Sequence, residues 1–299
     1  MTTFNRLSIS QFRNIENLSF NACDQVNLIY GANGSGKTSI LEALHVLATG
    51  KSFRSTKTAP IIRNGSNELT VFAELNGGVS VGLQKFRNQK PALKLQGDKQ
   101  SNWVEVARLL PIQVLDSTTF RLLEGSPGER RRFLDWGVFH VEPAFVDHWR
   151  NSKKCIANRN QLLKSSRPDI DQVRAWNVEL DRVATLVDQA RQGYFSRFVP
   201  IFQDVVRKIA EIGDISLNYR RGWDAERDLL QVLVSTENQD LKYGTTQAGP
   251  HRADIVVKHE GVPASDVLSR GQQKMLVSAL KLAQGVIQAE NTERTCIFL

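Results

Sequence analysis

The chain has 299 residues, 41% of them hydrophobic and 8% aromatic, which allows one large buried core or two smaller ones and excludes a disordered sequence. Its formal net charge of +8 favours an anionic partner, nucleic acid above all, although an ordinary basic protein has the same balance. Three widely spaced cysteines argue against a zinc site or a disulfide framework. The sequence shows neither a secretory signal nor a run of about 20 apolar residues, so we expect a cytoplasmic protein with no membrane segment.

The first third of the chain alternates between strand and helix signals. Residues 6–12 and 16–22 alternate apolar and polar side chains, as half-buried antiparallel strands do. The apolar run 25–31 (QVNLIYG) leads into a glycine-rich turn, so we expect another strand there. Residues 37–50 have helical apolar spacing and end at a glycine, and short strands separated by NGS and NGG turns are expected over 60–116.

A helical stretch begins after Pro127. It is rich in polar residues, nearly free of glycine and helically periodic, and we expect Pro168 and Pro200 to mark breaks or helix starts within it. We assign residues 126–212 to a helical lobe, or arm.

Strand signals return after this lobe. Residues 215–223 and 253–259 are expected strands, and one helix is expected from about Gln272 to Gln288. We therefore predict an α/β body with an inserted helical lobe, the body being formed by 1–125 and 213–299.

One motif carries specific chemistry. The sequence GANGSGKT fits the phosphate-binding pattern G-x-x-x-x-G-K-[ST] in full, between an expected strand and an expected helix. Its glycines let backbone N–H groups wrap around phosphate oxygens, Lys37 would reach the β- and γ-phosphates of ATP, and the Thr38 hydroxyl would ligate Mg²⁺. A glycine-rich turn with an exposed lysine is the alternative. The predicted ATP-binding residues are Gly31, Ala32, Asn33, Gly34, Ser35, Gly36, Lys37 and Thr38.

A second motif, LSRGQQK, precedes the last expected helix. Ser269 suits the helix N-cap, and Gln272 completes a capping box, so a well-capped helix is one interpretation. The motif also resembles the signature of the ABC-type ATPases, in which the serine and the helix N-terminus contact the γ-phosphate bound by the opposite subunit. The resemblance assigns this role to Ser269, Arg270, Gly271 and Gln272.

The separation of the two motifs and several short sequence segments together resemble the bacterial RecF family. About 230 residues separate Lys37 from Ser269, too many for a compact transporter ATPase, and the lobe is too short for a long coiled coil. The segments FRNIENL, GKSFRS, GSPGERRRFLDWGVFHVEP and YGTTQAGPHRADI extend the resemblance over most of the chain.

The resemblance implies a specific function. It implies an ABC-type P-loop ATPase head with a mixed sheet, an antiparallel β subdomain and a short helical arm. It further implies an ATP-dependent homodimer, associated with the nucleoid, that binds duplex or gapped DNA in replication, repair and the SOS response to DNA damage. Such proteins help RecO and RecR to load RecA, and their ATPase is slow and DNA-stimulated.

Charge placement adds a weaker indication. The stretch from Arg150 to Arg167 has six basic residues and no acid, as phosphate-backbone binding requires, although a solvated helix face has the same pattern. Aromatic residues are sparse here, so contact with duplex DNA is favoured over base stacking. The candidate DNA contacts are Arg150, Lys153, Lys154, Arg159 and Lys164.

Several other polar residues are assigned only in outline. At least one arginine of the run 130–132 is expected to pair with a carboxylate. His251 and Arg252 are expected to close a turn rather than approach a nucleotide. The resemblance places Arg13 and Asn14 near the base and ribose of the nucleotide.

The last four residues, CIFL, have the composition of a buried strand in a parallel sheet. Comparison with ABC-type ATPases identifies this run as the Walker B strand, with its acids expected beyond Leu299, so this chain is expected to bind ATP and to hydrolyse it poorly. The alternatives are a nucleotide-dependent DNA-binding scaffold without catalysis and, less favoured, a transporter ATPase subunit or a P-loop kinase.

Overall fold

The computed structural model describes residues 3–116, 120–292 and 294–299, and the chain divides into two compact units. Residues 1–115 and 292–299 form one, the sheet unit, and residues 116–291 form the other, the helical unit. Among the described residues, the sheet unit contains one cluster of buried apolar side chains and the helical unit contains two.

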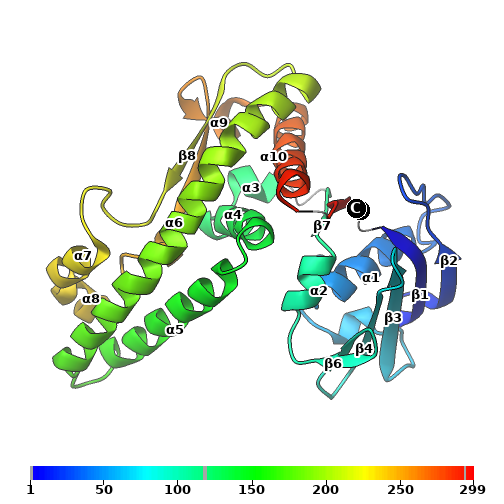
Figure 1. Ribbon diagram of the computed structural model, residues 1–299, viewed down its shortest axis with the longest axis horizontal. Coiled ribbons are helices and arrows are strands. Elements are labelled where there is room, and N and C mark those ends of the chain that lie inside the picture. Colours follow the sequence, from blue (N-terminus) through cyan, green and yellow to red (C-terminus); the bar gives the residue numbers. More distant parts are fainter. Residues whose placement is uncertain (1–2, 117–119, 293) are drawn as a thin grey trace. The chain divides into compact units, whose positions relative to one another are not determined.

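The sheet unit is built on an antiparallel sheet with strand order β2-β1-β3-β4-β5-β6, against which α1 packs (Figure 1). Ile9 in β1 lies opposite Leu18 in β2 and Val71 in β3, as the alternating pattern predicts. Its elements are β1 (Phe4–Phe12), β2 (Ile15–Asn21), α1 (Lys37–Thr49), η1 (Ala59–Ile61), β3 (Glu68–Leu75), β4 (Ser80–Phe86), β5 (Ala92–Leu95), β6 (Asp98–Gln100), α2 (Val104–Leu109), β7 (Ile112–Gln113) and β11 (Ile297–Phe298).

The strand predicted at residues 25–31 is wrong for the described structure. The segment pairs with no other described strand, and Val26, Leu28 and Tyr30 are more than 80% exposed. The chain bends where this segment starts, and across the bend Asn27 accepts a hydrogen bond from the Cys23 N–H and donates one to the Cys23 carbonyl. Apolar alternation alone therefore did not produce a strand here, since no neighbouring strand supplies backbone partners.

The end of the chain forms a short parallel pair. Ile297 and Phe298 in β11 pair with Ile112 and Gln113 in β7, so the predicted parallel strand is confirmed. Cys296 is buried, which raises the pKa of its thiol to about 12, whereas Phe298 is 37% exposed.

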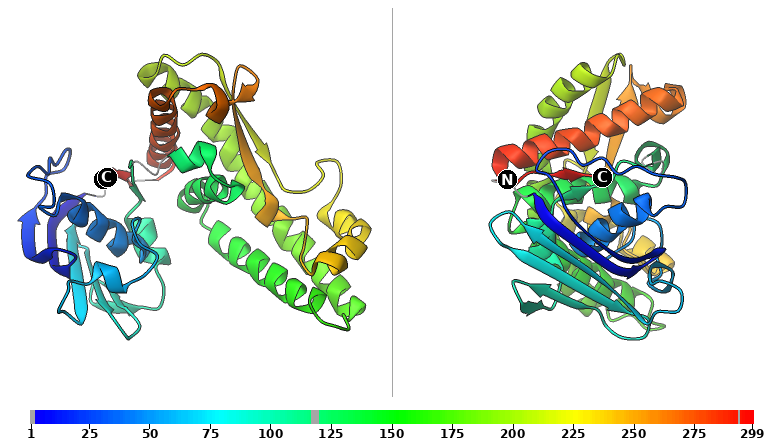
Figure 2. Two further views of the ribbon diagram at one scale, coloured as in Figure 1. Left: turned by 180° about the vertical axis from the view of Figure 1, so that it is seen from behind. Right: turned by 90° about the vertical axis from the view of Figure 1, so that its right-hand side faces the viewer.

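The helical unit is dominated by two long antiparallel helices, α5 and α6, which lie side by side in both ribbon views (Figures 1 and 2). α7 and α8 lie at one end of this pair (Figure 1). Its elements are α3 (Arg121–Glu124), α4 (Pro127–Val141), α5 (Phe145–Leu163), α6 (Ile170–Ile209), β8 (Ile215–Arg220), α7 (Leu229–Ser235), α8 (Glu237–Tyr243), η3 (Pro250–Arg252), β9 (Asp254–His259), β10 (Val262–Pro263), α9 (Ala264–Val267) and α10 (Arg270–Asn291).

Of the two prolines predicted to interrupt the lobe, one marks a helix start and the other does not. α6 begins just after Pro168, with Asp169 as its N-cap accepting a hydrogen bond from the Gln172 N–H. Pro200 lies inside α6, so the break predicted there is wrong. Phe198 and Phe202, fully buried on either side of it, hold the helix against the core and offset the missing backbone hydrogen bond.

The two units differ from the predicted domain boundaries. The prediction placed residues 213–299 with the N-terminal part, whereas residues 213–291 belong to the helical unit. The reason is packing: β8 pairs with β9, and both α10 and β8 contact α6. The predicted helix at 272–288 is confirmed as α10, which is slightly longer.

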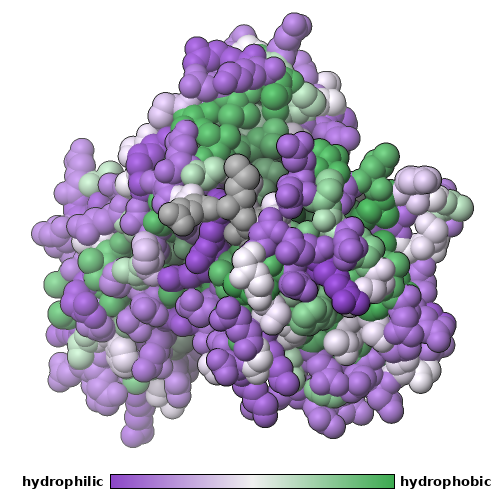
Figure 3. All heavy atoms as spheres, turned by 45° about the vertical axis from the view of Figure 1, so that its right-hand side comes forward, coloured by the Kyte–Doolittle hydropathy of each residue, from purple (hydrophilic) through white to green (hydrophobic). Residues whose placement is uncertain are grey.

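The surface carries mainly hydrophilic side chains on the face shown in Figure 3. Within the ranges that the structure describes, no helix is both long and apolar enough to cross a membrane.

Candidate functional site

The glycine-rich loop passes directly into the first turn of α1. Gly36 takes the N-cap position with φ of 101°, in the left-handed region, and a Cβ there would lie 3.3 Å from the Asn14 side-chain nitrogen. Both constraints favour glycine at this junction. The first turn contains no acidic side chain, so its unpaired N–H groups and positive dipole are available to an anion.

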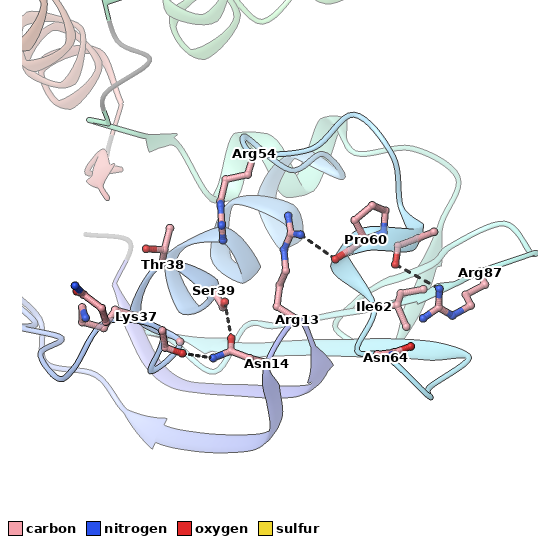
Figure 4. Close-up of a pocket in the computed structure, with 14 residues that line it drawn as sticks. Arg13, Asn14, Lys37, Thr38, Ser39, Arg54, Pro60, Ile62, Asn64 and Arg87 are labelled. Atoms are coloured by element: carbon pink, nitrogen blue, oxygen red, sulfur yellow. Dashed lines mark hydrogen bonds between the residues drawn. The ribbon is translucent and has the colours of Figure 1, made fainter.

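Lys37 and Thr38 begin the helix beside this loop (Figure 4). The Lys37 ammonium donates hydrogen bonds to the Gly31 and Ala32 carbonyl oxygens, both at 2.8 Å. These bonds keep the positive charge beside the first residues of the loop. Thr38 is exposed, so its hydroxyl is accessible. The structure thus brings a cation, a hydroxyl and free backbone N–H groups to one point.

Asn14 connects the β1–β2 turn to this loop. Its side-chain nitrogen donates to the Gly34 carbonyl at 2.8 Å, and its oxygen accepts from the Ser39 hydroxyl at 2.9 Å (Figure 4). Asn14 therefore ties the β1–β2 turn both to the glycine-rich loop and to the first turn of α1.

A buried carboxylate lies behind the loop and orients two arginines. Glu42, fully buried in α1, accepts hydrogen bonds from Arg13 Nε at 3.0 Å and Nη2 at 2.6 Å, and from the Ser52 hydroxyl. Arg54 Nη1 lies 3.4 Å from the same carboxylate. Arg13 also donates to the Pro60 carbonyl, so it is held at two points, whereas Arg54 remains 46% exposed.

These residues line one pocket of about 760 Å³, drawn in Figure 4. Lys37, Arg13, Arg54 and Arg87 contribute positive charge, and no described residue of the lining is acidic. Ile62 adds an apolar wall away from the loop. A pocket with this charge and one apolar end is suited to a nucleoside polyphosphate.

Sequence reasoning missed Glu42 and Arg54 as contributors to this site. A signal for Glu42 was present in the sequence, since this charged residue lies directly between Leu41 and Ala43 and one helical turn before Val46, all apolar. A buried charge requires a partner, and two arginines supply it here.

The signature residues begin α10 and form a reciprocal capping box. The Ser269 N–H donates to Gln272 Oε1 at 2.9 Å, and the Gln272 N–H donates to Ser269 Oγ at 3.3 Å, so the predicted capping is confirmed. A Cβ on Gly271 would meet nothing within 4 Å. Arg270 pairs with Glu124 and lies over the Phe120 ring. The start of α10 is thus an exposed, ordered surface.

The structure separates the predicted DNA contacts into two groups. Arg150, Lys153, Lys154 and Lys164 are exposed, with Lys153 over the Trp149 ring at 3.6 Å.

Arg159 does not belong to this exposed group, and the prediction that it contacts DNA is wrong. It is completely buried, pairs with Asp240 at 2.7 Å and donates to Asn177 Oδ1 and Thr246 Oγ1 at 2.6 and 2.8 Å. A signal was available in the sequence: Arg159 lies four residues after Cys155, and the two share one helix face.

The remaining polar residues are mostly structural. Arg130 donates to Asp254 through Nε and Nη2, and Arg132 pairs with Glu129, which confirms the expected carboxylate pairing. His251 lies in η3, the turn that was predicted, with Nε2 2.9 Å from the Thr246 carbonyl.

Comparisons with known proteins agree with this architecture. The model of the family described as RecF/RecN/SMC N terminal domain matches residues 3–299. The chain is 41% identical over 298 residues to the DNA replication and repair protein RecF of Cellvibrio japonicus, covering 98% of this chain and 82% of the relative. It is 39% identical over 298 residues to the RecF of Pseudomonas aeruginosa, covering 98% and 81%.

Solved structures share the fold. The recombination mediator protein RecF-ATP in the RecFOR pathway superposes with a TM-score of 0.91 at 22% identity, over 99% of this chain and 84% of that chain. The Smc head domain from Pyrococcus furiosus gives 0.55 at 13% identity, over 100% and 90%. The predicted ABC-type head fold, with an antiparallel sheet and a helical arm, is confirmed.

Proposed function

The chain belongs to the RecF/RecN/SMC N-terminal-domain family, as a RecF-type protein of DNA replication and repair, and from this premise we propose that it binds DNA under the control of ATP. The proposal rests on one observation above all: the pocket of about 760 Å³ combines the glycine-rich loop, Lys37 and Thr38 with three arginines.

ATP fits this pocket by charge and by chemistry. The loop N–H groups and the Lys37 ammonium match the β- and γ-phosphates, and Arg13 and Arg54 add positive charge beside them. Mg²⁺ keeps most of its ligands as water and phosphate oxygens, so the single exposed Thr38 hydroxyl suits it. The metal would neutralise phosphate charge, while this chain's own groups hold the triphosphate in place.

DNA binding is proposed for the exposed basic residues of α5 and the turn after it. Arg150, Lys153, Lys154 and Lys164 carry their charges into solvent, where phosphates of a duplex or a single-strand/double-strand junction can reach them.

A second copy of the chain is the proposed partner of the α10 start. Ser269 and Gly271 present an exposed, side-chain-poor helix N-terminus that suits the γ-phosphate held by another subunit. An ATP-bridged homodimer on nucleoid DNA in the cytoplasm, working with RecO and RecR to load RecA, is the complete proposal. The solved relative named above as RecF-ATP belongs to the RecFOR pathway, which supports this assignment of partners.

Fluorescence anisotropy on labelled gapped duplex, with and without ATP and at two salt concentrations, tests the proposal. We expect ATP to strengthen binding, added salt to weaken it, and Lys37→Ala to lower ATP affinity by about tenfold or more, because a hydrogen-bonded charge is removed. Lys57→Ala, an exposed lysine outside the pocket lining, is the matched control. Binding that responds to neither ATP nor salt would overturn the proposal.

A further inference from the structure

A second pocket, of about 610 Å³, lies within the helical unit where the turn after β8 meets η3. It gathers the YRRGW and GPHRAD segments, whose residues have no part in the nucleotide site. We call it the arginine pocket and define it by Arg220, Arg221, Trp223 and Arg252.

The two backbone segments of the arginine pocket are locked together. The Gly249 N–H donates to the Gly222 carbonyl at 3.1 Å. Gly222 has φ of 96°, and a Cβ there would lie 2.3 Å from the Gly249 carbonyl and 2.6 Å from the Ala253 nitrogen. Glycine at 222 is therefore required for this close approach, and the pocket is a fixed feature of the fold.

Two of the three arginines retain unused hydrogen-bonding capacity. Arg220 is exposed and makes no hydrogen bond or ion pair with its side chain among the described residues. Arg252 is exposed, and among the residues that the structure describes its side chain donates to the Gln247 amide oxygen alone, at 3.1 Å. A guanidinium has five N–H donors, so most of the donors of Arg220 and Arg252 face solvent or a ligand.

Arg221 forms a fixed wall. Its guanidinium lies 4.6 Å from the Trp223 ring and donates to the Asp224 and Arg227 carbonyls, and it lies 3.9 Å from Asp188. It contributes shape and some charge, while Arg220 and Arg252 supply the donors.

Nearby acids do not neutralise the pocket. Asp254 lines it, but both of its oxygens accept from Arg130, at 2.7 and 3.0 Å. The described lining of the pocket holds three arginines and this one acid, so positive charge is in excess there.

We propose that the arginine pocket binds a phosphate of the DNA backbone, held by Arg220 and Arg252. The inference rests on the proposed DNA-binding function and assigns it a contact away from α5. Planar guanidiniums match phosphate oxygens in pairs, and the aromatic wall formed by Tyr219 and Trp223 suits the sugar attached to that phosphate.

The experiment measures anisotropy of labelled gapped duplex from 50 to 200 mM salt for the whole chain and for Arg220→Gln/Arg252→Gln. We expect about tenfold weaker binding and a salt slope smaller by about one, because one phosphate contact is lost. Arg182→Gln/Arg207→Gln removes the same charge from exposed positions of α6 and is expected to change neither quantity. Arg220→Gln alone guards against misfolding, since that side chain has no described partner.

The outcomes separate the two proposals. If the wild-type chain binds DNA and the pocket variant keeps both affinity and salt slope, the arginine pocket is not a phosphate site and the proposed function stands. If the wild-type chain does not bind DNA, the proposed function fails, and this inference with it. If the variant loses binding to a labelled decaglutamate peptide but not to DNA, the pocket is an acidic-protein site and the inference is overturned.

Discussion

Glu42 and Asp240 are buried carboxylates that each bind arginine, and the two clusters differ in what covers them. Glu42 in the sheet unit binds Arg13 and Arg54, whose side chains remain 20% and 46% exposed beside the 760 Å³ pocket. Asp240 in the helical unit binds Arg159, and both side chains are completely buried. The first cluster presents guanidinium groups to a pocket, whereas the second contributes only to the fold.

The comparison shows that an arginine's role depends on the segment packed over it. Arg159 is enclosed by the residues around Thr246, some 87 positions away in the sequence. Arg54 remains 46% exposed, so its charge can still reach a ligand.

Among the variants considered, replacement of Arg159 is expected to reduce the free energy of unfolding the most. Arg159→Ala leaves the buried Asp240 carboxylate without its charge partner, and we expect the free energy of unfolding to fall by about 3–5 kcal/mol. Urea denaturation measures it. Lys154→Ala, on the exposed face of the same helix, is expected to stay within about 0.5 kcal/mol. Similar values for the two variants would contradict the structural role of Arg159.

Glu42→Gln tests the other cluster. The amide offers one acceptor oxygen and no charge to two guanidiniums, so we expect a loss of about 1–3 kcal/mol, reduced by the solvent exposure of Arg54. Because Arg13 and Arg54 are also released from their positions, ATP affinity is expected to fall, as calorimetry would show. Glu16→Gln, which removes an exposed pair with Arg63, should alter neither. Unchanged ATP affinity in Glu42→Gln would mean that the carboxylate does not position the pocket arginines.

Ser269→Ala removes an uncharged hydroxyl outside both arginine clusters, and we expect a smaller loss of stability from it. The substitution removes the capping acceptor of α10, and we expect about 1 kcal/mol less stability in urea denaturation. Ser265→Ala serves as the control, because the Ser265 hydroxyl donates to the neighbouring, exposed Asp266 carboxylate and does not cap α10. A larger loss for the control than for Ser269→Ala would argue against the capping role.

His251 gives the smallest effect, and its sign depends on pH. Burial lowers the pKa of His251 below the usual value near 6.5. The contribution of neutral His251 to the free energy of unfolding is therefore complete above about pH 6.5. It is lost as the pH falls through the lower pKa of the folded state, because the unfolded chain binds the proton at a higher pH than the folded chain does. Melting temperatures from pH 8 to 5 should fall less steeply for His251→Gln than for the wild-type chain. Parallel curves would show that His251 does not contribute.

Part of the site was predictable and part was not. The loop before α1 and the capping box before α10 were identified because each is a contiguous motif whose residue types dictate local geometry. The strand at 25–31 and the break at Pro200 were mispredicted because both depend on distant partners. A strand requires a neighbour, and a proline can remain inside a helix when Phe198 and Phe202 are anchored in a core.

The family resemblance, the glycine-rich loop with Lys37 and Thr38, and the capped start of α10 can be read from the amino-acid sequence, because short-range spacing fixes those features. Folding of the whole chain is needed to bury Arg159 while Lys154 on the same helix stays exposed, and to bring Arg220 and Arg252 into one pocket. Helical periodicity tells which residues share a face, but the segment that covers that face comes from elsewhere in the chain. Burial then decides whether a charge serves the fold or remains available to a ligand.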